Sequence, residues 1–219
     1  MYANINGMKI WYDQSGEQGS PVLLLMGFGM TSEAWMPQVE TLEKHHQVLR
    51  MDNRGVGRSD KVHSGYTLRD MASDAAALVE HQCFKDVHVV GVSMGGMIAQ
   101  IISAQYPKKV KSFTLIASTA STPSPFNAPS RPVRKLMMER SKNPNASAEE
   151  VIKREIKIVS LIGMEGRIVD TPEFREETIK NLNRAQDGSG YARQLLSILA
   201  SKDRLKKIQK IKAPTLIIH

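Results

Sequence analysis

Short apolar runs and longer amphipathic stretches alternate along the first half of the chain. The apolar runs, each of five or six residues, cover 22–26, 47–51, 87–92 and 112–117. Stretches with helical periodicity separate them, at 33–45, 67–81 and 95–105. Strands that are apolar along their whole length are typical of a parallel sheet with helices on both faces. The pattern therefore predicts an α/β fold with a doubly wound, mostly parallel sheet.

The N-terminal segment carries a different signal. Residues 2–5 and 8–12 alternate apolar and polar positions, and Asn6-Gly7 stands between them. Asn-Gly is a preferred pair in a two-residue hairpin turn, where both residues need a positive φ. We expect an antiparallel hairpin at the start of the chain.

The alternation of strands and helices stops after residue 117 and returns with a last apolar run at 215–218. The intervening segment begins with a proline-rich connector and continues with amphipathic helical patterns at 133–141, 148–162, 172–186 and 191–200. Helices inserted between two strands of a sheet commonly form a separate layer. We expect residues 1–120 and 206–219 to form the α/β core and residues 121–205 to form a helical cap.

Charge and composition exclude several classes of protein. With 219 residues and 41% apolar content, the chain is long enough to bury a core. The formal net charge of +8 comes from residues 131–212, which hold 19 Lys and Arg against 11 Asp and Glu. Acids and bases are interspersed there at helical spacing and aromatic residues are scarce, which indicates solvated helix faces. We expect no nucleic-acid partner.

The single cysteine, Cys83, excludes an internal disulfide and leaves little basis for thiol or zinc chemistry. We expect its side chain to fill a small apolar space. The chain starts without the basic and apolar regions of a signal peptide, and it has no run of 18 apolar residues. We expect no metal, cofactor or membrane partner, and a cytoplasmic location.

The first chemical motif is Gly91-Val92-Ser93-Met94-Gly95, which follows an apolar strand and precedes a helix. A serine on so tight a turn needs small neighbours, and Gly91 and Gly95 supply that room. A dinucleotide-binding G-x-G-x-x-G motif would need glycine at position 93, and the chain has no G-K-[ST] sequence for a P-loop. We predict that Ser93 is a catalytic nucleophile.

The second motif, Met26-Gly27-Phe28-Gly29, ends the strand at 22–26. A hydrolase that forms a tetrahedral intermediate needs backbone N–H groups aimed at the developing oxyanion. One comes from the residue after the nucleophile and one from a loop of this kind. We predict that the N–H groups of Phe28 and Met94 form this oxyanion hole, with Gly27 as a turn residue.

A third motif, D-x-R-G-x-G-x-S at 52–59, lies between the other two. The order LLLMGFG, D-x-R-G-x-G-x-S, HVVGVSMGG and KIKAPTLII resembles the α/β-hydrolase superfamily, in particular its cofactor-free esterases, enol-lactonases and perhydrolase-like members. The resemblance covers essentially the whole chain, loosely in the helical insertion. It implies a doubly wound sheet, a helical cap over the active site and a Ser/Asp/His triad.

The same resemblance assigns roles to single residues. It implies that Asp52 and Arg54 hold their loop together and are not catalytic. Many relatives have histidine where this chain has Met26, so we expect the hydrogen bonding of that loop to differ. The nucleophile is an aspartate in the haloalkane dehalogenase and epoxide hydrolase branches, and Ser93 argues against both.

The triad acid and histidine are not found where the resemblance places them. The chain order in this fold is serine, acid, histidine. In relatives the acid lies a few residues after the strand at 215–218 and the histidine one strand later, whereas the sequence printed above ends at His219. We expect neither group in this chain, a structural role for His219, and an uncovered sheet edge through which the chain could self-associate.

A triad built from the residues present would combine Ser93 and His219 with one of Asp170, Asp187 or Asp203. We disfavour it because all three acids fall in the helical insertion or its connections. The other histidines precede Ser93; among them His88 lies inside a strand and His81 ends a helix.

The function that these residues favour is hydrolysis of a small carboxylic ester through an acyl-enzyme on Ser93. Hydrolysis of a lactone or a C–C bond with the same nucleophile is an alternative, as is a binding protein that keeps the fold without the triad. We expect the helical cap to line the pocket over Ser93. Its apolar lining would include some of Met137, Met138, Leu161, Met164, Leu195 and Leu196.

Overall fold

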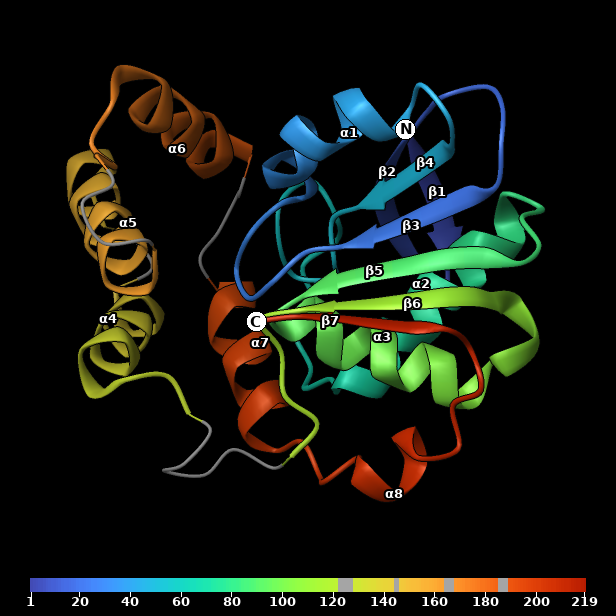
Figure 1. Ribbon diagram of the computed structural model, residues 1–219. Helices are drawn as coiled ribbons and strands as arrows, with labels where there is room; N and C mark the ends of the chain where they lie inside the picture. The colour runs from blue at the N-terminus through green and yellow to red at the C-terminus, as the bar shows by residue number, and fades with distance from the viewer. Residues whose placement is uncertain (122–127, 144–145, 164–167, 185–188) are drawn as a thin grey trace.

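The computed structural model describes residues 1–121, 128–143, 146–163, 168–184 and 189–219. In these residues the strands form one seven-stranded sheet, with helices on both of its faces (Figure 1). The strands are β1 (Tyr2–Ile5), β2 (Met8–Ser15), β3 (Pro21–Leu25), β4 (Gln47–Met51), β5 (Val87–Val92), β6 (Val110–Ile116) and β7 (Thr215–Ile218).

The helices fall into two groups along the chain. Those that connect the strands are η1 (Ser32–Trp35), α1 (Met36–Leu42), α2 (Leu68–His81), α3 (Met94–Gln105), η2 (Pro107–Lys109) and α8 (Leu205–Ile208), where η marks a 3₁₀ helix. Those of the insertion are α4 (Arg131–Lys142), α5 (Ala148–Ile162), α6 (Pro172–Arg184) and α7 (Ser189–Leu199).

The sheet has the order β1-β2-β4-β3-β5-β6-β7. Strand β2 is antiparallel to β1 and to β4, and all later neighbours are parallel. The chain passes from β3 to β4 on one side and then crosses back to β5 on the other. The predicted doubly wound, mostly parallel sheet is confirmed, and β3 and β5 mark the point where the winding reverses, which is where ligands bind in such sheets.

Strand β3 shows why its apolar run is continuous. Leu23 and Leu25 pack in one core with residues of α2 and α3, whereas Val22 and Leu24 pack in a second core with Trp35 and other residues of η1 and α1. Successive side chains of a strand point to opposite faces, so a strand covered on both faces needs apolar residues throughout.

Local signals explain two of the element boundaries. Asn6 (φ 50°) and Gly7 (φ 75°) form the turn of the β1–β2 hairpin, as their sequence predicted. Helix α2 begins with a capping box in which the Thr67 hydroxyl accepts from the Asp70 N–H and the Asp70 carboxylate accepts from the Thr67 N–H.

The four helices of the insertion do not all lie at the same distance from the sheet. Helix α7 lies at the carboxyl ends of the central strands, while α4, α5 and α6 form a separate layer farther from the sheet (Figure 1). All four helices of the insertion occur where the sequence predicts them. The division into a core at 1–120 and 206–219 and a cap at 121–205 stays a prediction.

Strand β7 lies at one edge of the sheet, opposite to β1, and all four of its residues are exposed. Leu216, Ile217 and Ile218 are therefore apolar side chains at an open edge. Self-association through this edge stays a prediction. Among the described residues, no helix has the length and apolar character needed to cross a membrane.

The prediction for Cys83 was wrong. The chain reverses direction just after α2, and Cys83 adopts a left-handed conformation there (φ 55°). Its thiol is exposed and fills no apolar space. An isolated small residue in a polar stretch gives no periodic signal, so its burial could not be inferred from the sequence.

Candidate active site

Ser93 lies between β5 and α3, at the carboxyl edge of the sheet. Its backbone has φ 52° and ψ −117°, a conformation that costs a non-glycine residue about 1–3 kcal/mol. The backbone is held from two sides: the Ser93 N–H donates to the Ile116 carbonyl (2.8 Å), and the Ser118 hydroxyl donates to the Ser93 carbonyl (2.7 Å). The residue itself is exposed, so its hydroxyl is accessible at the top of the turn.

The glycines beside Ser93 are required by backbone packing. A Cβ atom on Gly91 would lie 2.4 Å from the Gly95 carbonyl oxygen, and one on Gly95 would lie 2.1 Å from the Leu25 carbonyl oxygen. Real Cβ atoms do not approach so closely. The strand-to-helix turn therefore packs against itself and against β3 with no room for a side chain at either position.

The loop after β3 lies alongside this turn. A Cβ atom on Gly27 would stand 3.4 Å from the Ser93 Cβ and 3.9 Å from its hydroxyl oxygen. Met94 is the first residue of α3, where a backbone N–H has no acceptor within its own helix. Phe28 follows Gly27 directly. The two loops are thus neighbours, and the oxyanion hole formed by the Phe28 and Met94 N–H groups stays a prediction.

The loop after β4 is organised by Asp52. This buried carboxylate accepts hydrogen bonds from the Ser32 N–H (2.8 Å), the Ser32 hydroxyl (2.8 Å) and the Arg58 N–H (3.0 Å). It joins its own loop to η1, which follows the loop after β3. The contacts are those of a structural residue, as the resemblance implied.

Arg54 has an equally structural environment. Its guanidinium donates twice to the fully buried Asp74 carboxylate, at 2.6 Å each. Burial by itself would lower the pKa of Arg54, but the hydrogen bond and charge of Asp74 raise it above its ordinary value. The nearby Tyr66 hydroxyl donates to the carbonyls of Arg54 and Gly190, and burial raises the pKa of this phenol, which stays protonated.

Helix α7 contacts both loops through residues that the sequence analysis did not identify. The fully buried Gln194 accepts from the Gly29 N–H (2.9 Å) and donates to the Arg54 carbonyl (3.2 Å). The Tyr191 ring lies 4.1 Å from the Phe28 ring, centroid to centroid. A glutamine within the apolar side of an amphipathic helix was the only signal for this contact. These contacts join the insertion to the loop that carries Phe28.

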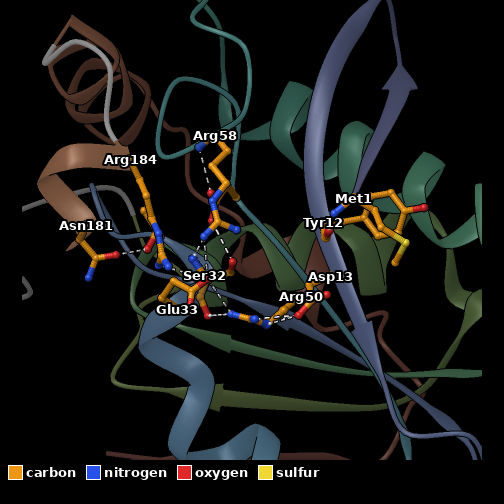
Figure 2. A network of polar contacts seen from close by, with 11 residues as sticks. Met1, Tyr12, Asp13, Ser32, Glu33, Arg50, Arg58, Asn181 and Arg184 are labelled. Carbon is orange, nitrogen blue, oxygen red and sulfur yellow. Dashed lines mark hydrogen bonds and ion pairs between the residues drawn. The ribbon is translucent and has the colours of Figure 1, made fainter. Parts of the chain in front are cut away.

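A second connection between the insertion and the core is polar (Figure 2). The carboxylate of Glu33 in η1 meets the guanidinium groups of Arg50 (3.3 Å), Arg58 (3.2 Å) and Arg184 (3.1 Å), the last of which belongs to α6. Beside it, the Thr31 hydroxyl donates to the Asn181 side chain of α6 (2.5 Å). No pattern in the sequence indicates this network.

The structure does not assemble a triad from the residues it describes. In the described ranges, no imidazole or carboxylate hydrogen bond to the Ser93 hydroxyl is present. His219 follows β7 and is exposed. Since neighbouring strands lie about 4.8 Å apart and two separations intervene, its backbone is on the order of 10 Å from that of Ser93.

The other candidate groups are engaged elsewhere. Asp170 pairs with Arg175, and Asp203 accepts from the Leu205 N–H (2.7 Å). Asp187 lies outside the described residues. His88 sits at the opposite end of β5 from Ser93, with its ring nitrogens next to the hydroxyls of Ser20 (3.0 Å) and Ser112 (2.7 Å).

The side chains predicted to line the pocket fall into three groups. Met138, Leu161 and Leu196 are exposed, and Met137 and Leu195 are half-buried. Met164 lies outside the described residues. A lining role over Ser93 stays a prediction.

Comparison with known proteins places this fold in a family. A family model described as alpha/beta hydrolase fold matches residues 20–153. RutD of Azorhizobium caulinodans, to which carbamate hydrolysis is ascribed, is 33% identical over 115 residues, which cover 52% of this chain and 43% of RutD. Rhodomycin D methylesterase DnrP of Streptomyces peucetius is 27% identical over 193 residues, covering 78% of this chain and 65% of the enzyme. The chain thus spans less than two thirds of either relative.

A solved structure has the same architecture over the full chain. The enol-lactonase from Burkholderia xenovorans LB400 superposes with a TM-score of 0.81 at 23% identity, covering 99% of this chain and 80% of the lactonase. At that identity the likeness shows the fold alone. Because the family model matches more than half of the chain and includes both the loop after β3 and the turn at Ser93, the chain belongs to the α/β hydrolase fold family.

Proposed function

We propose that this protein hydrolyses carboxylic esters, with Ser93 as the nucleophile that forms an acyl-enzyme. The observation that carries the proposal is the Ser93 turn itself. A serine is held in a costly backbone conformation, exposed at the reversal point of a doubly wound sheet, with the glycine loop after β3 beside it. Strain of this kind persists where surrounding structure enforces it, and it is characteristic of catalytic sites.

The chemical role of each group follows from this arrangement. The Ser93 oxygen would attack the ester carbonyl, and the N–H groups of Phe28 and Met94 would stabilise the resulting oxyanion. Loss of one such donor lowers turnover by roughly a hundredfold or more. The helix that begins at Met94 also directs its positive end toward this point, which favours negative charge there.

The names of the similar proteins support an ester bond as the substrate. DnrP is a methylesterase and the Burkholderia protein an enol-lactonase, and a lactone is a cyclic ester. RutD differs, since its name refers to a carbamate. All three reactions replace an acyl substituent with water, so the bond type shared by these three proteins is an acyl–heteroatom bond, and two of the three act on an ester.

The general base is the missing element of this proposal. No described histidine forms a hydrogen bond with the Ser93 hydroxyl, and we propose that the base and its acid partner are not among these 219 residues. A serine at its ordinary pKa is a weak nucleophile without a base. A triad hydrolase that retains only its oxyanion hole and substrate binding accelerates the reaction by about 10³–10⁴-fold over water.

The experiment is to treat the chain with p-nitrophenyl acetate and follow both acylation, by mass spectrometry of peptides, and steady-state release of p-nitrophenol. We expect slow acylation of Ser93, little turnover, and no adduct in Ser93→Ala. The control Ser160→Ala removes an exposed serine on α5 and should acylate as the parent does. Rapid turnover in the parent chain that is lost in Ser93→Ala would mean that a general base is present among these 219 residues. It would still support Ser93 as the nucleophile.

A second function is favoured by one observation, namely that no imidazole pairs with Ser93 in the described residues. On that basis the chain would bind small molecules without catalysis. Absence of a Ser93 adduct with both p-nitrophenyl acetate and a fluorophosphonate, in a chain that is folded by circular dichroism, would favour this function over the hydrolase.

A further inference from the structure

A cavity of about 270 Å³ lies apart from the Ser93 site. It is lined by the start of α2, the second half of α3, the end of α7 and the residues that lead into α8, and it is partly open to solvent. Gln100, one of its wall residues, follows Ser93 by seven positions on α3. At 1.5 Å per residue, that places it about 10 Å farther along the helix axis. The cavity is therefore not part of the ester site.

The wall of this cavity contains the buried Arg204, of which 5% is exposed. Its guanidinium nitrogens donate to the Gln100 side-chain oxygen (2.8 Å), the Thr119 carbonyl (2.9 Å) and the Lys202 carbonyl (3.3 Å). All three acceptors are neutral. In contrast to Arg54 with Asp74, Arg204 forms no ion pair with any residue that the structure describes.

A buried cation without a counter-ion is unfavourable, because it has lost its hydration without gaining an opposite charge. Burial lowers the pKa of Arg204, and the negative charge of Asp203 only partly opposes this effect. Asp203 is exposed, and its carboxylate accepts from the Leu205 N–H instead. An anion in contact with the guanidinium would supply the missing charge.

The rest of the wall has the character of an anion site with an apolar side. Arg69, Lys202 and Lys207 also line it, so that cationic residues outnumber the single acid, Asp203. The hydroxyl of Ser201, another wall residue, is buried and has no hydrogen-bond partner among the residues that the structure describes. It could donate to an anion bound in the cavity.

The apolar side is formed by Leu68, Ile101 and Ala104. A strongly hydrated inorganic anion would gain nothing from these side chains, whereas a hydrocarbon chain would be removed from water against them. The volume is just below the range of about 300–1,000 Å³ that accommodates drug-sized ligands. It suits a ligand of a few carbon atoms with one charged end.

We propose that this cavity binds a small organic carboxylate, with its charged end on Arg204 and the Ser201 hydroxyl and its hydrocarbon body against Leu68, Ile101 and Ala104. The site is independent of the ester chemistry at Ser93. It would let the protein sense a short-chain acid without placing that acid at the nucleophile.

Titration calorimetry of the 219-residue chain with three probes tests the chemistry of the ligand. Hexanoate carries both the charge and the chain, 1-hexanol carries only the chain, and inorganic phosphate carries only charge. We expect hexanoate to bind about tenfold or more tightly than either, because a hydrogen bond to a charged donor and the apolar contacts both contribute. Equal binding of 1-hexanol, tighter binding of phosphate, or no binding of hexanoate would overturn the proposal.

Three substitutions test the location. Ala104→Leu should fill the apolar side and abolish hexanoate binding without touching Arg204. Lys207→Gln should weaken binding severalfold, whereas Lys206→Gln, a neighbouring exposed lysine outside the wall, should leave it unchanged. Arg204→Gln should abolish binding, but it also removes bonds that join Gln100 to Thr119, so Ala104→Leu is the decisive variant. Unchanged hexanoate binding in Ala104→Leu would place the ligand elsewhere and refute the site.

Discussion

Helix α3 is apolar along almost its whole sequence, whereas helix α6 alternates charged and apolar residues, and the structure places the two differently. Every residue of α3 from Met94 to Ser103 is buried, whereas α6 has no buried residue. Helix α3 is enclosed by the sheet, α2 and α8, while α6 contacts the core mainly through polar side chains. Ser93, the proposed nucleophile, thus directly precedes a helix that is buried over most of its length, whereas the outer helices are held by few contacts.

The difference in burial between the insertion and the core also affects how well each tolerates amino-acid substitutions. Side chains such as Leu161, Ile162 and Ile168 of the insertion are exposed, so changing them disturbs little packing. By contrast, a methyl group added at Gly91 or Gly95, in the turn at Ser93, would collide with backbone atoms. We therefore expect the core to set the position of the reacting atoms and the insertion to tolerate change, as loops and peripheral layers commonly do.

The largest effect should come from glycine in the turn. Gly95→Ala places a Cβ against the carbonyls of Leu25 and Met26, and because the backbone cannot give way, the strain should exceed the roughly 1–3 kcal/mol of ordinary overpacking and threaten the folded state itself. Urea denaturation measures this, and loss of folded protein is the extreme result. Gly65→Ala, where a Cβ meets no atom within 4 Å, is the matched control and should change stability by less than about 0.5 kcal/mol. Equal stability of both variants would contradict the tight turn.

The next effect compares one ion pair in each region. Asp74→Ala leaves the buried Arg54 without its partner and should cost about 3–5 kcal/mol in the free energy of unfolding. Glu139→Ala removes an exposed pair with Lys135 on α4 and should cost no more than about 0.5 kcal/mol. Thermal and urea unfolding of both variants provide the measurement. Similar losses would mean that the outer helices are as well packed as the core.

A smaller effect is expected where the two regions meet. Gln194→Ala removes the hydrogen bonds that Gln194 forms with the Gly29 N–H and the Arg54 carbonyl, and two buried hydrogen bonds together contribute about 1–3 kcal/mol. Acylation of Ser93 should also slow, because the loop with Phe28 loses its hydrogen bond to α7. Leu199→Ala, which changes an exposed side chain of the same helix, is the control and should leave both unchanged. If Gln194→Ala changes neither stability nor the rate of Ser93 acylation, α7 does not support the loop that carries Phe28.

The smallest effect concerns pH. Burial, with the charges of Lys111 and His46, lowers the pKa of His88 in the folded protein. The unfolded chain then binds more protons, so the stability from this group is present above the unfolded pKa of about 6.5 and is lost as pH falls below it. His88→Gln should flatten the decline of stability between about pH 7 and pH 5.5, and His63→Gln, which replaces an exposed histidine, should not. A parallel decline in all three proteins would exclude His88 as its source.

The sequence predicted those features that depend on neighbours in the chain. The hairpin at Asn6-Gly7, the strands, and the turn at Ser93 each follow from a local pattern. Gln194 and Gly29 are separated by 165 positions, and nothing near either residue indicates their contact. The same holds for Glu33 with Arg184, and for Asp74, which the sequence analysis passed over inside a helix. Cys83 was misjudged because a residue just past a helix end has no periodic neighbours to indicate its burial.

The backbone angles of Ser93 have a consequence for how such proteins change over time. Glycine adopts that conformation without the cost of about 1–3 kcal/mol that serine incurs. A chain that makes no use of the Ser93 hydroxyl would therefore become more stable by exchanging Ser93 for glycine. Under the proposed function, serine at this position marks a trade-off between stability and chemistry, in which a small thermodynamic disadvantage is retained for as long as the hydroxyl is used.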